Sequence, residues 1–263
     1  MKILHVLDHS LPLHSGYTFR SANLFREQLK RGWRPVVVTS PKHEASWKGP
    51  WSETETIHGI CYHRSGPLTP HPSTCYSRLP DSRLPDSRFT TSRFTISRFT
   101  TSRFTISRLH DFTISRLHDF TSQLLLIHRL SQRIQQVAAA ERPDLLHAHS
   151  PVLNALAALR AGRRLGLPVV YEIRAFWEDA AVDHGTTGEG SLRYRFTRAL
   201  ETWACRRVDH VAVLCHGIRG DLIRRGIPSH KITPVFNGVD TEAFGSVPPD
   251  EELRESWGLR GKT

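Results

Sequence analysis

The sequence alternates short apolar segments with longer amphipathic ones, and this alternation constrains the fold more than any other feature. Short, continuous apolar runs of this length are typical of strands in a parallel sheet that is covered on both faces. These runs are Ile3–Leu7, Val36–Val38, Asp144–His149, Pro168–Ile173, Val208–Leu214 and Ile232–Phe236, and a further strand is expected over Ile57–His63. The sequence therefore predicts an α/β fold with a Rossmann-like, doubly wound parallel sheet.

Apolar residues spaced three to four apart predict the helices between these strands. The core face of a helix over Tyr17–Lys30 is expected to carry Ala22, Phe25 and Leu29. Further helices are expected over Gln123–Glu141, Val152–Leu165, Ser191–Arg207 and Gly217–Arg225. In the helix over Ser191–Arg207, the predicted apolar stripe consists of Leu192, Phe196, Leu200 and Trp203.

The composition leaves several classes of partner open. A formal net charge of +11 is compatible with nucleic acid, anionic lipid or phosphorylated ligands. Because no apolar run reaches bilayer length and the first strand begins at once, we expect a cytoplasmic protein without a signal peptide. The four cysteines form no CxxC pair, so we expect reduced thiols and neither a zinc site nor a disulfide framework.

A repetitive segment, Ser77–Ser122, interrupts the α/β pattern. Ser-Arg recurs every five residues and then after eight, which matches neither the helical nor the strand period. One interpretation is an arginine-rich arm that binds nucleic acid or an acidic surface. The units are nearly identical, which favours a second interpretation, the expansion of a short DNA repeat within a surface loop. Nucleic acid is therefore not the expected partner. We expect this segment to be disordered.

Polar residues at the carboxyl ends of the predicted strands are the candidate site. Ser15, Gly16 and Tyr17 lie where the loop after the first strand meets a helix, a place where backbone N–H groups can bind anions. Gly16 would allow a phosphate or sugar to approach, although it could equally serve only a turn. The motif is not GxGxxG, which argues against a dinucleotide.

Two histidines alternate at the end of the strand Asp144–His149 and so share one face. We expect His149 to be the more exposed of the two and to be the catalytic candidate, with His147 in the core. The histidines between Pro41 and Pro72 lack carboxylates at ligand spacing, so surface positions are expected for them and no metal site is predicted.

The strand Pro168–Ile173 also ends in charged residues. Arg174, Glu178 and Asp179 are predicted to bind a polar acceptor together. The glycine-rich stretch His184–Gly190 that follows reads as a flexible loop.

A turn near the end of the sequence, KITPVFNGVDTEAF, suggests a passage between two domains. Asn237-Gly238 tolerates a positive φ and would redirect the chain sharply after the last strand. The run VDHVAVLCHGIRGDLIRRGIPSHKITPVFNGVDTEAF resembles glycosyltransferase family 4. The resemblance as a whole covers residues 1–76 and 123–250. The segments HSLPLHSGYTFRS, SPVLNALAALR and YEIRAFWEDAAVDHGTT resemble a narrower group that accompanies bacterial exosortase and exopolysaccharide gene clusters.

The resemblance implies a retaining enzyme of the GT-B type, with two Rossmann-like domains, a nucleotide-sugar donor, a glycan or lipid-linked acceptor and no cofactor or metal. It implies that Gly16 approaches the donor phosphates or acceptor and that His149 lies near the donor sugar. Asn237, Gly238 and Asp240 would form the interdomain hinge.

The expected organisation is an acceptor-side domain over 1–76 and 123–240, the repeat over 77–122, and a hinge with the start of the donor domain over 241–263. The basic pair and glutamates that hold the donor in this family would follow residue 263, so we expect little or no turnover by this chain alone. Membrane contact at the inner face and a non-catalytic gene fragment remain alternatives.

Overall fold

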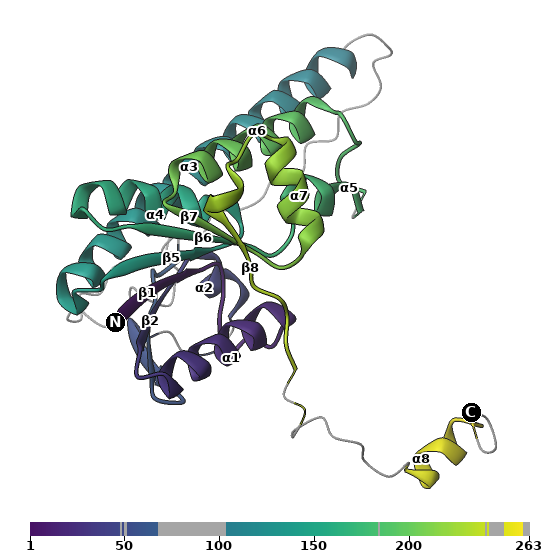
Figure 1. Cartoon of the computed structure of the whole chain (residues 1–263). Coiled ribbons are helices and arrows are strands. Elements are labelled where there is room, and N and C mark those ends of the chain that lie inside the picture. The colour runs from purple at the N-terminus through teal and green to yellow at the C-terminus, as the bar shows by residue number, and fades with distance from the viewer. Residues whose placement is uncertain are drawn as a thin grey trace, which may run out of the picture.

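The protein, described by a computed structural model, contains one eight-stranded sheet with helices on both faces (Figure 1). The structure describes every residue except 48, 50, 51, 68–103, 184, 240, 242–249 and 260–263. The strands are β1 (Lys2–Leu7), β2 (Arg34–Thr39), β3 (Thr54–Ile57), β4 (Ile60–His63), β5 (Leu145–His149), β6 (Val169–Ile173), β7 (His210–Val213) and β8 (Ile232–Pro234). The helices are α1 (Gly16–Lys30), α2 (Lys42–Ser46), α3 (Phe104–Glu141), α4 (Val152–Leu165), α5 (Trp177–Asp183), α6 (Leu192–Arg207), α7 (His216–Arg224) and α8 (Glu251–Ser256), and a 3₁₀ turn covers Ser229–Lys231.

The sheet order is β3-β4-β2-β1-β5-β6-β7-β8, and all neighbours are parallel except the β3–β4 pair. From β1 the sheet extends through β2 and β4 to the edge strand β3 in one direction, and through β5, β6 and β7 to β8 in the other. This confirms the doubly wound parallel sheet. The prediction of a single strand over Ile57–His63 is wrong. His58 and Gly59 both have positive φ and form the turn of a β3–β4 hairpin.

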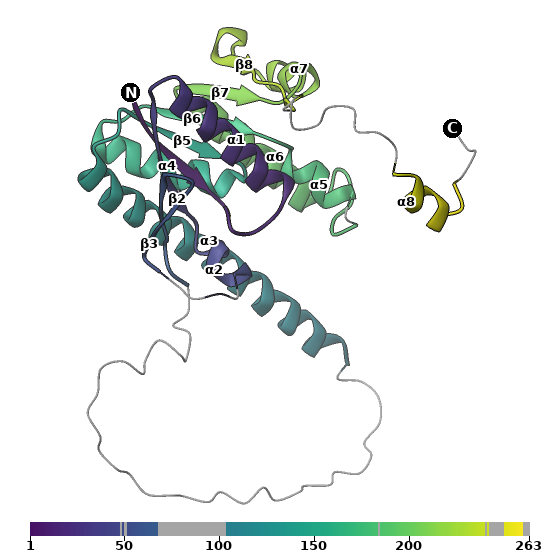
Figure 2. The same ribbon diagram turned by 90° about the horizontal axis from the view of Figure 1, so that it is seen from below.

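The two faces of the sheet differ in how they are covered (Figure 2). One face packs against α3, α4 and α6 in a large apolar core that includes Leu4, Leu146, Tyr171 and Ile134. The other face lies under α1, where a smaller cluster contains Leu7, Phe25, Val37, Ile60 and Tyr62. Beside that small cluster the strands place buried polar side chains, among them His5, His149 and Glu172.

This polar lining explains one error in the expected core face of α1. Phe25 is buried as predicted, but Leu29 is 41% exposed. The other buried residues of the helix are Thr18, Ser21 and Gln28. Polar side chains point toward the sheet there because the strands beneath offer hydrogen-bonding partners and only a small apolar surface.

The predicted apolar stripe of α6 is wrong at Leu192, Phe196 and Trp203, whereas Leu200 packs against the large apolar core as a partly buried residue. Leu192 is 84% exposed and Phe196 is 60% exposed, while the buried positions are Glu201, Ala204 and Cys205. The hydroxyl of Tyr171 donates a hydrogen bond to Glu201 Oε1 (2.5 Å) inside the core. Glu201 can therefore be buried on this helix because its carboxyl has a hydrogen-bonding partner on the sheet, which the periodicity of apolar residues does not reveal.

Helix α3 begins at Phe104, inside the Ser-Arg repeat, so the expectation that ordered structure resumes only at Gln123 is wrong. The sequence from Phe104 to Glu141 contains neither proline nor glycine, and a helix anchored by buried residues such as Leu130 and Ile134 can propagate along it. The part of the repeat before Phe104 lies outside the described residues. Within the described ranges, no helix combines the length and apolar character needed to cross a bilayer.

Candidate functional site

The carboxyl ends of β1, β5 and β6 meet at one edge of the sheet, where the strand order reverses. In open α/β sheets this edge is the usual position of a ligand site. Asp8 follows β1, His149 ends β5 and Arg174 follows β6. The N-terminus of α1 faces the same edge, because Arg174 Nη1 donates to the backbone oxygen of Tyr17 (2.7 Å). Polar groups from four elements are therefore brought together.

Arg174 is at the centre of this group of polar residues. Its Nε donates to Glu172 Oε1 (2.9 Å), and its Nη2 donates to Ser21 Oγ (3.0 Å) and to His149 Nδ1 (2.8 Å). The guanidinium also lies 4.1 Å from the centroid of the Tyr17 ring. All of these partners belong to the protein, and the side chain is only 9% exposed. Arg174 therefore organises the edge in this conformation and does not present a free charge to an acceptor.

A chain of hydrogen bonds runs from Arg174 through two histidines to α1. Because a guanidinium can only donate, His149 Nδ1 must accept from Arg174, which places the proton of a neutral ring on Nε2. That nitrogen lies 3.0 Å from His5 Nδ1, and His5 Nε2 lies 2.9 Å from Gln28 Oε1. One tautomer of each ring satisfies every bond, so the chain has a single direction from Arg174 to Gln28.

All three histidines on this face of the sheet have a pKa below the usual value of 6.5. Burial lowers the pKa of His5 and His149, and burial together with the neighbouring His149 lowers the pKa of His147 to about 3. Ring nitrogens of the three residues all lie within 4.8 Å of one another, a spacing that could hold a metal ion. We interpret the cluster as a hydrogen-bonded chain, because His5 and His149 already have partners for both nitrogens and two arginines nearby would repel a dication.

Glu172 is the counter-ion of this buried group. Its Oε1 accepts from Arg174 and also from Arg20 Nε (3.0 Å), while Oε2 lies 3.6 Å from His147 Nε2. Burial opposes ionisation of the carboxyl, but His149, His147 and Arg174 outweigh it and hold the pKa of Glu172 well below its usual value. The site therefore contains one carboxylate shared by two guanidinium groups.

The more open part of the edge lies beside the loop after β1. Lys42 Nζ is 3.4 Å from Asp8 Oδ1 and 5.0 Å from the ring of Trp177. Burial raises the pKa of Asp8, but His9 and Lys42 outweigh it, so the carboxyl titrates below its usual value. Since Lys42 and Trp177 are each partly exposed, an approaching ligand can reach an ammonium group and an indole ring here.

The predicted residues of the first loop have distinct roles. Ser15 caps α1 by accepting from the Thr18 N–H (3.2 Å), and its Oγ lies 3.1 Å from His9 Nε2. A Cβ added at Gly16 would meet nothing within 4 Å, so the space next to this residue is open to a ligand. Tyr17 stacks on His9 at 4.6 Å between ring centroids, and its hydroxyl accepts from the Asp8 N–H (3.1 Å).

Glu178 and Asp179 do not join Arg174, contrary to the prediction that the three act together. Glu178 is buried and pairs with Arg225 (2.8 Å), on the side of α7. Asp179 is exposed and accepts from the Tyr194 hydroxyl (2.9 Å). The helical turn of α5 points these neighbours in different directions, and neither contacts the guanidinium of Arg174.

The expected exposure of the histidines must also be corrected. His149 is completely buried, and it is the His147 side chain that retains 13% exposure. The cause is α1, which covers the end of β5 through Ser21 and the Arg174 contacts. In the segment after β2, His43 and His63 are buried too, so the expectation of surface positions is wrong for both.

Several residues of this edge were missed by the sequence analysis. Asp8 directly follows β1, and Lys42 opens α2 shortly after β2 ends at Thr39, so the rule that ligands bind at strand carboxyl ends could have found both. Arg64 directly follows β4, so the same rule could have found it, whereas Arg20, within α1, gave no such signal. Arg64 is buried and donates to Ser10 Oγ (2.6 Å) and to the Leu11 oxygen (2.7 Å), and thereby holds the loop after β1 in place.

The predicted hinge residues Asn237 and Gly238 follow β8. Asn237 is exposed and accepts a hydrogen bond at Oδ1 from Arg20 Nη1 (2.7 Å). A Cβ at Gly238 would meet nothing within 4 Å. Asp240 lies outside the described residues.

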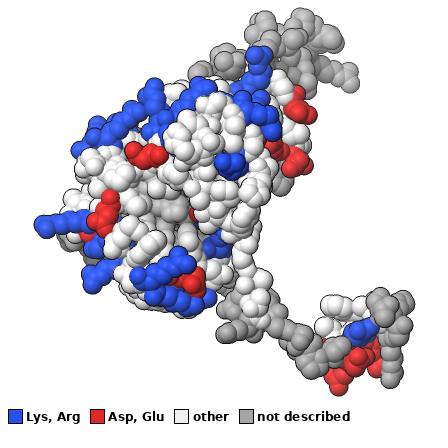
Figure 3. All heavy atoms as spheres, viewed as in Figure 1, with Lys and Arg blue, Asp and Glu red and all other residues white. Residues whose placement is uncertain are grey.

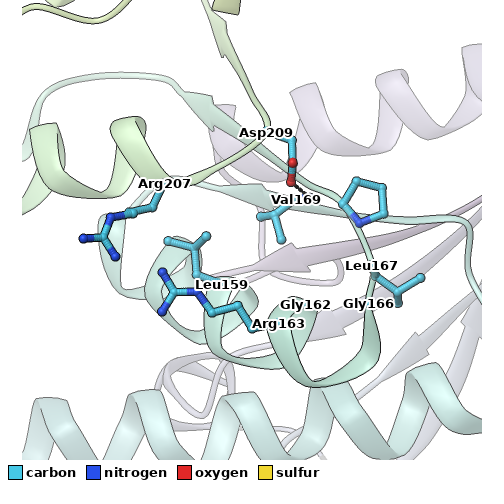
Figure 4. Close-up of a pocket in the computed structure, with 9 residues that line it drawn as sticks. Leu159, Gly162, Arg163, Gly166, Leu167, Val169, Arg207 and Asp209 are labelled. Carbon is cyan, nitrogen blue, oxygen red and sulfur yellow. Dashed lines mark hydrogen bonds between the residues drawn. The ribbon is translucent and has the colours of Figure 1, made fainter.

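A separate hollow of about 400 Å³ opens at the opposite end of the sheet (Figure 4). Arg163 and Arg207 lie on one side of it, and the Asp209 carboxylate accepts from the Val169 N–H (2.7 Å) on another. Val169 is the first residue of β6, so this hollow lies at the amino end of the strands. It is therefore distinct from the polar edge described above.

Comparison with known proteins agrees with the geometry. The sequence profile of Glycosyltransferase Family 4 matches residues 104–243, which is more than half of the chain. The chain belongs to glycosyltransferase family 4. A GDP-mannose-dependent alpha-mannosyltransferase of Mycobacterium tuberculosis is 29% identical over 120 residues, which cover 46% of this chain and 30% of that protein. The aligned region therefore spans less than a third of the length of that relative.

Solved structures support the fold of this family 4 chain. Sucrose-phosphate synthase of Thermosynechococcus elongatus is similar with a TM-score of 0.58 at 12% identity, covering 98% of this chain and 53% of that one. HepE of Anabaena, solved in complex with UDP, is similar with a TM-score of 0.52 at 14% identity, covering 98% of this chain and 50% of that one. At these identities the likeness concerns the fold, and this chain spans about half of each structure.

Proposed function

We propose that this chain forms the acceptor-side half of a retaining, nucleotide-sugar-dependent glycosyltransferase. The observation that carries the proposal is the family match over residues 104–243, which includes His149, Arg174 and the segment after β8. The polar edge at the strand reversal supports it, because a sugar and its phosphates need many hydrogen-bonding groups. The relative named for GDP-mannose and the structures named for UDP make a nucleoside diphosphate sugar the proposed donor.

The proposed division is an acceptor-side domain over 1–76 and 123–240, with the start of a donor domain over 241–263. When a nucleoside diphosphate leaves, its developing negative charge must be met by positive groups. At this edge Arg20 and Arg174 are already paired with Glu172, and the partly exposed Lys42 is paired with Asp8, so that the N-terminus of α1 is the other positive group for the ligand. An exposed helix end contributes only about 0.3–1 kcal/mol. We therefore propose that a second domain completes the donor site and that the chain alone has little or no activity.

Within this site we propose that Gly16 admits the ligand and that Ser15 and Tyr17 shape the loop around it. His149 is proposed as the catalytic histidine of the completed enzyme. In the present conformation both of its nitrogens are bonded to the protein, so contact with a sugar would require the Arg174 bond to open. Asp179 is exposed at the same end of the sheet and is proposed to contact the acceptor, whereas Glu178 would act only by holding α7 through Arg225.

We also propose a glycan or lipid-linked acceptor and a role in exopolysaccharide or other cell-surface glycan synthesis, within the exosortase-associated group. The glycosyl transfer would then take place in the cytoplasm, at the inner face of the membrane. Lys and Arg side chains gather along the upper margin of the view in Figure 3, where α4 and α6 lie in Figure 1. Next to the arginines of α6, Leu192 and Phe196 are exposed, a combination that favours contact with anionic lipid.

The proposed function is tested by comparing two forms of the protein. Purified 1–263 is incubated with GDP-mannose and UDP-glucose, and release of nucleoside diphosphate is measured with and without a lipid-linked acceptor. The same chain is then fused to the second domain of the mycobacterial relative. We expect turnover only from the fusion. Turnover by 1–263 alone would refute the need for a second domain.

A substitution in the fusion tests the site itself. His149→Ala should lower turnover, whereas His230→Ala, at an exposed position on the 3₁₀ turn, should leave it unchanged. General acid–base catalysis by one side chain typically accelerates a reaction about 10²–10⁴-fold. Equal turnover by both variants would exclude His149 from the mechanism.

A further inference from the structure

Arg20 connects two parts of the molecule that are more than 200 residues apart in sequence. It lies on α1, and its Nε donates to Glu172 Oε1 (3.0 Å) in the buried network. Its Nη1 and Nη2 donate to the backbone oxygens of Phe236 (3.3 Å) and Val235 (3.1 Å), and Nη1 also donates to Asn237 Oδ1 (2.7 Å). We call Val235–Asn237 the exit segment, because the chain leaves the sheet through it.

The exit segment has little apolar burial to hold it. Val235 is 37% exposed and Phe236 is 56% exposed. Its other contacts include one backbone bond from the Val235 N–H to the Val213 oxygen (2.7 Å) and the edge of the Phe236 ring against His216. In Figure 1 the chain runs from β8 past the end of α1 and then away from the sheet. Three hydrogen bonds from one guanidinium are therefore a large part of what fixes its direction.

We propose that Arg20 is a positioning residue that clamps the exit segment to the buried network of Glu172, Arg174 and His149. Arg20 and Arg174 share the same carboxylate oxygen, Oε1 of Glu172, and Arg174 donates to His149. The clamp is thus one end of a continuous set of bonds that begins at the ligand edge. A change in the pairing of Glu172 alters the charge environment of Arg20 and so the hold on the exit segment.

The residue type fits this role. A guanidinium presents five donors in a planar fork, which suits simultaneous contacts with a carboxylate, two carbonyl oxygens and an amide oxygen. Lysine has a compact ammonium group and cannot span these four acceptors. The Arg20 side chain is 15% exposed, so its bonds are partly protected from water.

The clamp has a consequence that rests on the proposed function. If the exit segment leads to a donor domain, an anionic ligand that draws Arg20 or Arg174 away from Glu172 would loosen the segment. Binding at the edge and movement of the second domain would then be coupled. The clamp itself is tested on the 263-residue chain without any transfer assay, so its failure and the failure of the proposed function can be distinguished.

The test is hydrogen–deuterium exchange of peptides that cover the exit segment, with peptides from β1 as an internal reference. Arg20→Gln should accelerate exchange of the Val235 amide about tenfold or more, because bonds to a charged group contribute about 1.5–3 kcal/mol. Arg20→Lys should behave similarly. Arg26→Gln, on the exposed side of the same helix and bonded only locally to Asn23, is the matched control and should leave exchange unchanged.

Two further variants test the two ends of the clamp, and the one at the exposed Asn237 separates it from general destabilisation. Asn237→Ala removes one acceptor without touching the buried network, and should accelerate exchange in the exit segment while β1 remains protected. Glu172→Gln touches no residue of the exit segment, yet should accelerate exchange of that segment by a larger factor than exchange of β1. If Arg20→Gln unfolds the whole chain, the exchange measured in Asn237→Ala decides whether the clamp holds the exit segment.

Unchanged exchange of the exit segment in Arg20→Gln and Asn237→Ala would overturn the clamp. Acceleration in those two variants, without a larger factor for the exit segment than for β1 in Glu172→Gln, would overturn the link to the buried network. Acceleration in all three, with β1 unaffected in Asn237→Ala and less accelerated than the exit segment in Glu172→Gln, is the result that the proposal requires.

Discussion

Replacing Glu172 with Gln should cost the protein a large part of its stability. The substitution keeps the shape of the side chain and removes its charge. Glu172 is 2% exposed, and its two partners, Arg20 and Arg174, are 15% and 9% exposed. Removing one member of a buried ion pair typically costs about 3–5 kcal/mol, because the remaining charge stays buried without a counter-ion. Since both arginines retain some contact with water, we expect the lower end, about 3 kcal/mol.

This loss is measurable because the free energy of unfolding of a protein domain is only about 5–15 kcal/mol. Urea unfolding at pH 7, followed by circular dichroism, gives the difference between Glu172→Gln and the parent. The matched control is Glu27→Gln, which removes an exposed carboxylate on α1 that pairs with Lys30 at 2.7 Å. Surface pairs of this kind contribute little, so the control should unfold at the urea concentration of the parent.

The pH dependence provides a second measurement. Because the pKa of Glu172 is held well below 4.5, its stabilisation is present above that value and is lost as the pH falls through the lowered pKa of the folded state. The parent should therefore lose more stability than Glu172→Gln on acidification below pH 4.5. A loss of less than about 1 kcal/mol at pH 7, or parallel acid profiles, would show that water already screens the two arginines and would refute the buried ion pair.

Three other substitutions test separate features. Burial raises the pKa of Glu201 to about 7 from 4.5, so the folded state binds the extra proton and stability should fall as the pH rises between these values, by about 3 kcal/mol in total. Glu201→Gln should abolish this fall in urea titrations at pH 4 and pH 8, and a retained fall would contradict the assignment. Gly162→Ala should cost about 1–3 kcal/mol, because the new Cβ would lie 2.7 Å from a Val169 methyl group and 2.9 Å from the Leu167 oxygen; an unchanged melting temperature would show that α4 can shift. Arg174→Met should free His149 Nδ1 to take either tautomer, whereas the parent should show only the Nε2–H form by ¹⁵N NMR, and a mixture in the parent would contradict the directed chain.

The strands were predicted well because a parallel sheet buries both of its faces and leaves a continuous apolar run in the sequence. Helix α4, which packs against the large apolar core, was also predicted with its boundaries. The faces of α1 and α6 were predicted only in part. Phe25 and Leu200 pack inward, but the other buried positions are polar or small, and Leu29, Leu192 and Phe196 point outward. Helical periodicity detects apolar residues, and it cannot see that Glu201 has Tyr171 as a partner or that Gln28 has His5.

The candidate site divides in the same way. The rule of strand carboxyl ends placed His149 and Arg174 at the correct edge, since that rule depends only on the order of elements. It could not show that Arg174 binds His149 and Glu172, or that Glu178 turns toward Arg225 instead. These pairings depend on the direction of each side chain within one helical turn, which local sequence does not encode.

The sequence by itself determined the α/β class, the parallel strands, the resemblance to glycosyltransferase family 4 and the edge at which polar residues gather. The tertiary structure alone decided which charges are free and which are neutralised, because Arg20, Glu172 and Asn237 are brought together from three distant segments. The physical reason is that hydrophobic periodicity is a local property of the chain. The pairing of a buried charge is a property of the packed protein, where each ion must find a counter-ion from whatever segment lies next to it.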